Sequence, residues 1–312
     1  NKISNLLTLQ SLPLIAGSGF YWNNGGEMTN KGFEIYANAK LLNLDILKWE
    51  LGMSIGHYRN RIGSLPDGDI VTSAYDAEIL TRVGYPAGVF YGYRTNGVYT
   101  SESDVEADPL MMTDSTGATH AFGAGDMHFI DEMADGIIDD NDKQIIGDPN
   151  PDLYGSFNSK ISIWDFTVEA FFTFSYGNDI YNYLRSELEA GSGFMNQTTA
   201  VLNRWYYDGQ ETGQPRVVYQ DPMGNARFSD RWIEDGSYLR LKSLSVSYRI
   251  PVNNSAIDGM DIWVAARNLW TLTSYLGRDP EVSAHPSVLF QGIDTGLTPH
   301  TRTFLIGIKM DL

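Results

Sequence analysis

An acidic stretch of the sequence has the residue spacing of a calcium-binding loop. Its carboxylates recur at the positions by which an EF-hand-type loop surrounds a hard cation with oxygen ligands. The predicted ligands are Asp131, Asp135, Ile137 through its backbone carbonyl, Asp139 and Asp142. Gly136 stands at the sixth position, where such a loop turns sharply. The spacing therefore predicts a divalent-cation site over residues 131–142, and calcium is the ion that such a set of oxygens suits.

Two residues of this loop depart from the usual pattern. Met133 occupies the third position, where Asp or Asn is common, and Asp142 is shorter than the Glu that usually stands at the twelfth. No pair of helices is evident around the loop, which argues against a calcium sensor. The alternative to a cation site is an acidic surface turn that binds no ion.

Four aromatic residues in the second half of the chain are candidates for contacts with a ligand. Trp205, Tyr206 and Tyr207 directly precede Asp208, and Trp232 follows further along the chain. Aromatic faces beside a polar side chain can stack on a sugar or hold a peptide. The alternative is that these residues pack the interior of their own loop region.

No group of residues predicts an enzyme. A glycoside hydrolase needs two carboxylates at a fixed separation, and the sequence singles out no such pair. The five histidines show no HExxH or other metal spacing, and neither a Gly-x-Ser-x-Gly turn nor a phosphate-binding glycine loop occurs. The absence of cysteine excludes disulfide and thiolate sites. We therefore expect no enzymatic activity and no organic cofactor.

The elements that must position these residues are long strands with alternating character. In the last of them, apolar residues take every second position and most of the others are polar or glycine; the apolar residues are Phe304, Ile306, Ile308, Met310 and Leu312. Further strands are expected at residues 33–41, 47–58, 156–163, 166–176, 238–250 and 260–273. Strands of eight or more residues are long enough to cross a bilayer at a tilt.

This pattern predicts an all-β fold, a transmembrane antiparallel β-barrel with short turns on one side and long extracellular loops on the other. The sequence has no run of about 18 apolar residues, which argues against transmembrane helices. The long loop regions span residues 64–153 and 178–236, and the second should contain short helices near 180–189 and 198–205. A soluble β-sandwich is the alternative fold, because its half-buried strands also alternate.

The net charge of −17 is concentrated in one loop region. Between Ser64 and Leu153 there are 18 Asp and Glu against 3 Lys and Arg, which accounts for 15 of the 17 excess negative charges. Such a block repels phosphates, so we expect no nucleic-acid partner. The chain begins at Asn1 without an initiator methionine or a signal-like segment, and we expect a fragment of a longer protein.

Several ordered segments along the chain are specific enough to compare with a known family. The main ones are residues 126–129, 145–152 and 229–242, and supporting matches lie at residues 30–34, 84–88, 91–93, 267–269, 278–281 and 299–304. Together they resemble the C-terminal part of the barrel in the SusC/RagA family of TonB-linked outer-membrane transporters. The family commonly ends its barrels on an aromatic residue, whereas this chain ends on Leu312.

The resemblance implies a 22-stranded barrel in the bacterial outer membrane, to which residues 1–312 would contribute about ten strands. It also implies active import of a glycan or an oligopeptide, energised by TonB, with a SusD-like surface lipoprotein as a lid. The plug, the TonB-contacting segment and the remaining strands would come from a part of the protein absent here. The alternative function is a soluble or surface-attached glycan-binding β-protein without transport activity.

Overall fold

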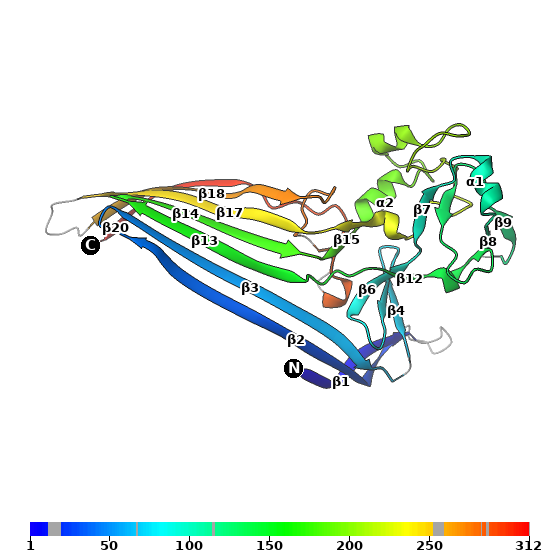
Figure 1. Cartoon of the computed structure of the whole chain (residues 1–312), viewed down its shortest axis with the longest axis horizontal. Coiled ribbons are helices and arrows are strands. Elements are labelled where there is room, and N and C mark those ends of the chain that lie inside the picture. Colours follow the sequence, from blue (N-terminus) through cyan, green and yellow to red (C-terminus); the bar gives the residue numbers. More distant parts are fainter. Residues whose placement is uncertain are drawn as a thin grey trace.

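The structure, a computed structural model, describes residues 1–11, 20–66, 68–113, 116–251, 259–281, 283–284 and 287–311. They form one long curved sheet with a layer of smaller elements at one end (Figure 1). No helix in the described part of the chain is long and apolar enough to cross a membrane.

The long sheet contains eight antiparallel strands whose spatial order follows their order along the chain. They are β1 (Lys2–Ser11), β2 (Phe20–Asn43), β3 (Leu47–Ser64), β13 (Leu153–Ile163), β14 (Phe166–Tyr176), β17 (Tyr238–Ile250), β18 (Gly259–Thr273) and β20 (Thr303–Asp311). This up-and-down order is that of a segment of a membrane barrel wall. In the described part of the chain, β1 and β20 are the two edges of the sheet.

Seven of the eight strands were predicted from alternation, and most of them extend beyond the predicted ranges. Strand β1 was not predicted. The expected number of about ten strands was too high for this sheet, because the shorter strands of the chain pair among themselves in smaller sheets. The final residue of the predicted last strand, Leu312, lies outside the described residues.

The register of the sheet places apolar side chains on one face across many strands. Val246 pairs with Val264, which in turn pairs with Ile306. Residues directly opposite each other in a sheet point to the same face. Ile306 is 77% exposed and Phe304 is 73% exposed, as expected for side chains that face lipid rather than a protein core.

The connections between the strands differ at the two ends of the sheet. At one end β2 and β3 are joined by residues 44–46, and β13 and β14 by Trp164 and Asp165 (Figure 1). At the other end the chain makes three long connections, residues 65–152, 177–237 and 274–302. We call these three connections the loop layer.

The loop layer is built from short strands and helices. Its strands are β4 (Ile70–Ala74), β5 (Ala77–Thr81), β6 (Ala87–Gly92), β7 (Thr95–Val98), β8 (Met111–Thr113), β9 (Thr119–Ala121), β10 (Met127–Phe129), β11 (Ile137–Ile138), β12 (Gln144–Gly147), β15 (Asp179–Asn182), β16 (Ile233–Asp235) and β19 (Ile293–Asp294). Its helices are α1 (Glu102–Ala107) and α2 (Tyr183–Glu189), with 3-10 turns η2 (Asp140–Asp142), η3 (Thr199–Asn203), η4 (Asp230–Trp232) and η5 (Val288–Phe290).

The helix predicted near residues 180–189 begins only at Tyr183. Residues 179–182 instead form β15, which pairs with β16 on one side and with β19 on the other. The helix predicted near residues 198–205 is the 3-10 turn η3. Residues expected to form the first turn of the helix therefore form a strand instead, because pairing with two distant strands outweighs their local helix propensity.

The buried core lies mainly in the loop layer rather than in the sheet. One apolar cluster contains residues from all three long connections: Ala77, Ile79, Phe90, Tyr181, Trp232 and Ile293. A second cluster surrounds Phe129 and Tyr99. Because these clusters exclude water as in a soluble domain, they hold the three connections in one arrangement above the wall.

A charge on the apolar face of the wall should destabilise the folded protein. We predict that Ile306→Lys in the full-length protein costs about 2–4 kcal/mol, because the ammonium group would lie in hydrocarbon. Urea titration in lipid vesicles, followed by heat-modifiable gel mobility, measures this cost. Ser245→Lys is the control, because Ser245 lines a polar pocket on the other face. Equal costs for the two variants would contradict the assignment of the faces.

Candidate functional site

The inner face of the wall carries a row of charges that alternate in sign from strand to strand. In the register of the sheet Lys40 of β2 lies opposite Glu50 of β3, and Glu50 lies opposite Lys160 of β13. Lys160 in turn lies opposite Glu169 of β14, with 2.9 Å between Nζ and Oε1. Opposite charges directly across a strand pair stabilise the sheet, so this row supports the pairing of four strands.

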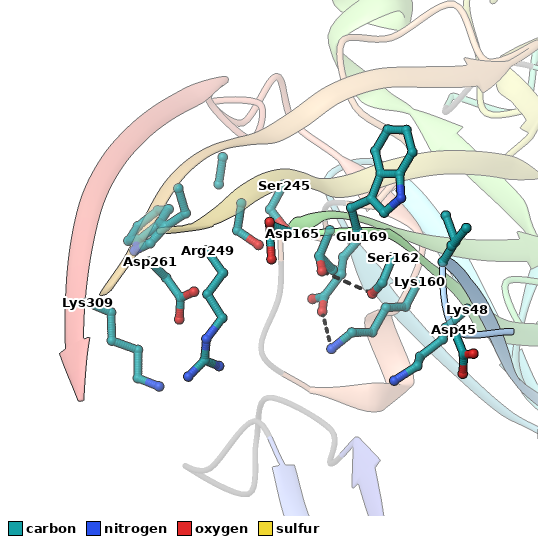
Figure 2. A pocket seen from close by; sticks show the side chains of 16 residues that line it. Asp45, Lys48, Lys160, Ser162, Asp165, Glu169, Ser245, Arg249, Asp261 and Lys309 are labelled. Carbon is teal, nitrogen blue, oxygen red and sulfur yellow. Dashed lines mark hydrogen bonds and ion pairs between the residues drawn. The ribbon is translucent and has the colours of Figure 1, made fainter. Parts of the chain in front are cut away.

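A pocket of about 630 Å³ lies on this inner face near the short turns. Figure 2 shows its labelled side chains pointing into the space that the curved sheet partly surrounds. Four cationic and four anionic side chains line it: Lys48, Lys160, Arg249, Lys309, Asp45, Asp165, Glu169 and Asp261. Because the two signs balance, this part of the wall is strongly hydrated but does not favour a ligand of either charge.

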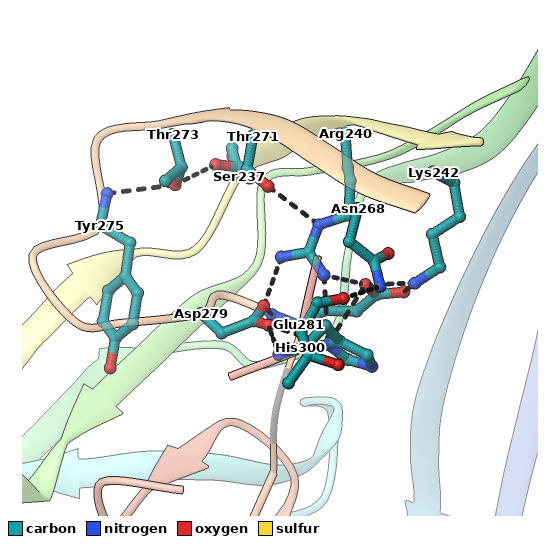
Figure 3. Close-up of polar contacts among 11 residues, drawn as sticks. Ser237, Arg240, Lys242, Asn268, Thr271, Thr273, Tyr275, Asp279, Glu281 and His300 are labelled. Carbon is teal, nitrogen blue, oxygen red and sulfur yellow. Dashed lines mark hydrogen bonds and ion pairs between the residues drawn. The ribbon is translucent and has the colours of Figure 1, made fainter. Parts of the chain in front are cut away.

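Further toward the loop layer, the Arg240 side chain of β17 joins the wall to residues 274–302 (Figure 3). Its guanidinium donates to Asp279 and, over 2.6 Å, to Glu281 Oε2. Its Nε donates to Thr271 Oγ1 on β18 over 3.0 Å. The side chains of Arg240 and Asp279 are only 3% and 2% exposed, so this ion pair is almost completely removed from water.

Two more side chains complete this group, which we call the Arg240 clamp. Lys242 Nζ donates to Glu281 Oε2 over 2.7 Å, and His300 Nδ1 lies 2.8 Å from Asp279 Oδ2. The clamp brings together three segments that are distant in the sequence, namely 240–242, 279–281 and 300. It therefore fixes both ends of the third long connection against the inner face.

The clamp lowers the pKa of the Asp279 carboxyl. Burial alone would raise this pKa, but hydrogen bonds from Arg240 and from the backbone N–H groups of His300 and Glu281 outweigh burial and hold it below its usual value. A carboxyl with a depressed folded-state pKa contributes stability above its unfolded-state pKa and loses that contribution as pH falls through the folded value. Asp279 therefore remains ionised, and the clamp intact, at neutral and mildly acidic pH.

Asp279, Glu281 and His300 have ligand-type atoms within 4.8 Å of one another, the spacing of a metal site. However, the Arg240 guanidinium contacts all three side chains, with 3.1 Å between its Nη1 and His300 Nδ1. The two cationic side chains of Arg240 and Lys242 already neutralise the two carboxylates. We therefore interpret this group as an ion-pair network rather than as a metal centre.

The predicted cation loop folds back on its own carboxylates. Asp131 Oδ2 accepts from the Gly136 N–H over 2.7 Å, and Gly136 has a φ of +81°, which glycine adopts without strain. Asp142 is fully buried, and its two oxygens accept from the backbone of Glu132 and Asp139 over 2.9 and 2.8 Å. The first and last predicted ligands are thus anchored by the loop backbone.

The other two predicted carboxylate ligands, Asp135 and Asp139, are less buried than Asp142. Asp135 is exposed and accepts from the Ile137 N–H, while Asp139 accepts from the Asn141 N–H at the start of η2. Asp131 Oδ1 is buried without a hydrogen-bond partner among the described residues. Among the described residues, no three carboxylates of this loop have oxygen atoms that all lie within 4.8 Å of one another.

The pKa of the Asp142 carboxyl is raised, chiefly because burial disfavours its charged form, while the neighbouring Asp131 carboxylate also disfavours a second negative charge. A bound cation would relieve both effects. The orphaned Asp131 oxygen and the buried Asp142 carboxylate therefore fit a hard cation, although the loop would have to contract to bring more ligands around it.

The four candidate aromatic residues divide into two kinds. Tyr206 and Tyr207 are 54% and 65% exposed, and they remain candidates for ligand contacts. Trp205 is partly buried against the second apolar cluster, and its Nε1 donates to the Thr100 carbonyl over 2.8 Å. Trp232 is fully buried, so in this arrangement it packs the loop layer and offers no face to a ligand.

Trp232 lies where the three long connections meet. Its Nε1 donates to backbone carbonyls of Ala226 and Arg227, and the guanidinium of Arg231 stacks 4.1 Å from its ring. Neither the Arg240 clamp nor the charge row was predicted from the sequence. Lys and Glu on the same face of successive strands were the available signal for the charge row.

Comparison with known proteins gives a consistent result along the whole chain, although no family model matches it. TonB-dependent receptor P3 of Formosa agariphila is 33% identical over 99% of this chain and 31% of its own length. TonB-dependent receptor P26 of the same organism is 26% identical, and TonB-dependent receptor SusC of Bacteroides thetaiotaomicron is 24% identical; each matches 99% of this chain. The chain spans about a third of the length of these relatives.

Solved structures show the same fold. The RagAB peptide importer in its closed-closed state matches 99% of this chain with a TM-score of 0.77 at 21% identity, and the match covers 32% of that chain. The RagAB peptide transporter matches with a TM-score of 0.74 at 22% identity over the same shares. The names of these relatives describe receptors and importers, and none describes an enzyme.

Removing the buried Arg240 from the clamp should lower the free energy of unfolding more than removing the partly exposed Lys242. We predict that Arg240→Met destabilises the folded protein by about 3–5 kcal/mol, because it leaves the Asp279 carboxylate buried without its cation. Lys242→Met should cost less than about 1 kcal/mol, because the Lys242 side chain is 28% exposed and water can replace it. Thermal unfolding and the rate of proteolysis within residues 274–302 measure both effects. Similar values for the two variants would refute the role of Arg240.

Proposed function

We propose that this chain, a member of the SusC/RagA family of TonB-dependent receptors, forms part of the wall and the loop layer of an importer in the bacterial outer membrane. The observation that carries the proposal is the similarity to such receptors over 99% of the chain. The two faces of the sheet support it, because one is apolar and exposed while the other is polar and charged. A wall between lipid and an aqueous passage requires this division.

The chain's part in import follows from its two layers. The loop layer would hold the cargo at the cell exterior, and the inner face of the wall would line the path that the cargo follows. The charge-balanced pocket near the short turns suits a hydrated passage. Energy from TonB and a movable plug would come from the rest of the protein.

The cargo would be an oligosaccharide or an oligopeptide. RagAB, whose barrel has this fold, is named a peptide importer. The exposed Tyr206 and Tyr207 could stack on sugar rings or pack against peptide side chains. A SusD-like surface lipoprotein is the proposed partner, and it would cover the loop layer after the cargo has entered.

A divalent cation, with calcium as the best fit, would complete the loop at residues 131–142. Asp131, Asp135, Asp139 and Asp142 would supply carboxylate oxygens, and Ile137 a backbone carbonyl. The support is the orphaned Asp131 oxygen and the buried Asp142 carboxylate. The ion would organise the loop and would take no part in a reaction.

Fractionation tests the membrane assignment. We predict that the full-length protein is found in the outer-membrane fraction, needs detergent for extraction and changes its gel mobility on heating, because its apolar face requires lipid or detergent. A protein that is monomeric and soluble without detergent would refute the barrel and favour a soluble glycan-binding protein. Copurification of an oligosaccharide, a peptide or a lipoprotein from the native membrane would identify the cargo class and the partner.

Removal of calcium tests the cation loop. We predict that EDTA lowers the melting temperature of the detergent-purified protein and speeds proteolysis within residues 131–142, because an ion that binds only the folded loop stabilises it. Asp131→Asn should abolish the response to calcium, whereas Glu106→Gln, at an exposed position on α1, should leave it intact. Identical melting with calcium and with EDTA would mean that the loop is an acidic turn without an ion.

A further inference from the structure

A second, smaller pocket of about 280 Å³ lies beside the Arg240 clamp. It is bounded by the outer end of β18 and by the two segments through which residues 274–302 leave and rejoin the wall. Strand β20 pairs with β18 only as far as Arg267, so beyond that residue this edge of β18 adjoins the pocket. The pocket does not belong to the cation loop or to the exposed tyrosines.

Three arginine side chains give this pocket an excess of positive charge. Arg240, Arg278 and Arg302 line it together with His300, and Asp279 is the one carboxylate among the described residues of its lining. Asp279 is already occupied, because it accepts hydrogen bonds from Arg240 and from the His300 and Glu281 backbones. Within the clamp, Arg240 and Lys242 therefore neutralise Asp279 and Glu281.

Arg278 and Arg302 are left without such a counter-charge. Both are exposed, and neither forms an ion pair with any residue that the structure describes. Two guanidinium groups that line the same small pocket give it a positive potential, which favours an anion. Since a guanidinium offers paired N–H donors that match a carboxylate or a sulfate, the pocket has the chemistry of an anion site.

Asn268 adds an unsatisfied acceptor to the same pocket. It lies at the bulge where the register of β17 and β18 shifts, with a φ of +52° in the left-handed region. Its Nδ2 donates to the Thr301 carbonyl over 3.0 Å, while its Oδ1 is buried and has no partner among the described residues. A buried acceptor of this kind is costly unless a ligand or a water molecule donates to it.

We propose that Arg278, Arg302 and Asn268 form a subsite for an acidic group of the cargo, a carboxylate or a sulfate with a hydroxyl or N–H donor beside it. The two guanidinium groups bind the anion, and Asn268 Oδ1 accepts from the neighbouring donor. The Arg240 clamp is the positioning element, because it holds the segments that carry Arg278 and Arg302 against β18. This inference rests on the proposed import function, since it concerns the cargo of the same protein.

Protection from an arginine reagent tests the subsite in the full-length, detergent-purified transporter. Phenylglyoxal modification is followed by mass spectrometry at Arg278 and Arg302, with the exposed Arg94 of the loop layer as the internal control. The probes are sodium sulfate, trigalacturonate and N-acetyl-trialanine, and the matched neutral probes are the methyl ester of trigalacturonate and N-acetyl-trialanine amide. The two pairs of organic probes distinguish an acidic sugar from a peptide carboxylate.

We expect at least one anionic probe to slow modification of Arg278 and Arg302 by about tenfold, as two charge-assisted hydrogen bonds would do. The neutral counterpart should protect much less, modification of Arg94 should be unchanged, and protection should weaken as salt rises. If no anion protects the two arginines, or if the neutral probes protect them equally, the subsite does not exist.

Variants separate this subsite from the import function. Arg278→Gln combined with Arg302→Gln should weaken binding of the protective anion by about tenfold, whereas Arg94→Gln should bind it as the native protein does. Unchanged affinity in the double variant would overturn the proposal. Outer-membrane fractionation and heat-modifiable mobility are measured on the same samples. Failure of those two measurements would count against the importer itself, and failure of protection alone would count against the subsite.

Discussion

The constraint on which the whole structure depends is that backbone N–H and C=O groups inside a bilayer find no water to bond. A continuous sheet satisfies these groups by pairing each strand with its neighbours, and in the described part of the chain seven adjacent strand pairs do so over long stretches. The same constraint makes one face apolar and the other polar. Strand length, alternation and the exposure of Ile306 and Phe304 all follow from it.

A wall that faces lipid on one side and water on the other has no interior in which to build a core. The apolar core is therefore located in the loop layer, where Phe90, Trp232 and Ile293 are fully buried between three long connections. Apolar side chains are covered differently in the two parts of the molecule. In the wall they face lipid, whereas in the loop layer only contacts with other protein side chains can exclude water. Without this shared apolar core, the three connections would be independent loops.

Charged side chains connect these two parts of the molecule. On the inner face they alternate in sign, so that neighbouring strands attract each other while the surface as a whole stays neutral. At the Arg240 clamp they are buried instead, and the ion pair with Asp279 holds the third connection to the wall. Because a buried pair costs much more to break than an exposed one, this contact defines where the loop layer rests.

Local patterns in the sequence predicted seven of the eight described strands of the wall, because the two-residue period of a strand is read from neighbouring residues and decides which face each side chain takes. The spacing of residues 131–142 likewise placed Asp131 and Asp142 at the two anchored ends of one loop. The burial of Trp232, the strand at residues 179–182 and the meeting of Arg240 with Asp279 were decided only by the tertiary structure. Each depends on segments tens of residues apart, and the distance between such segments is set by packing of the whole chain rather than by any local spacing.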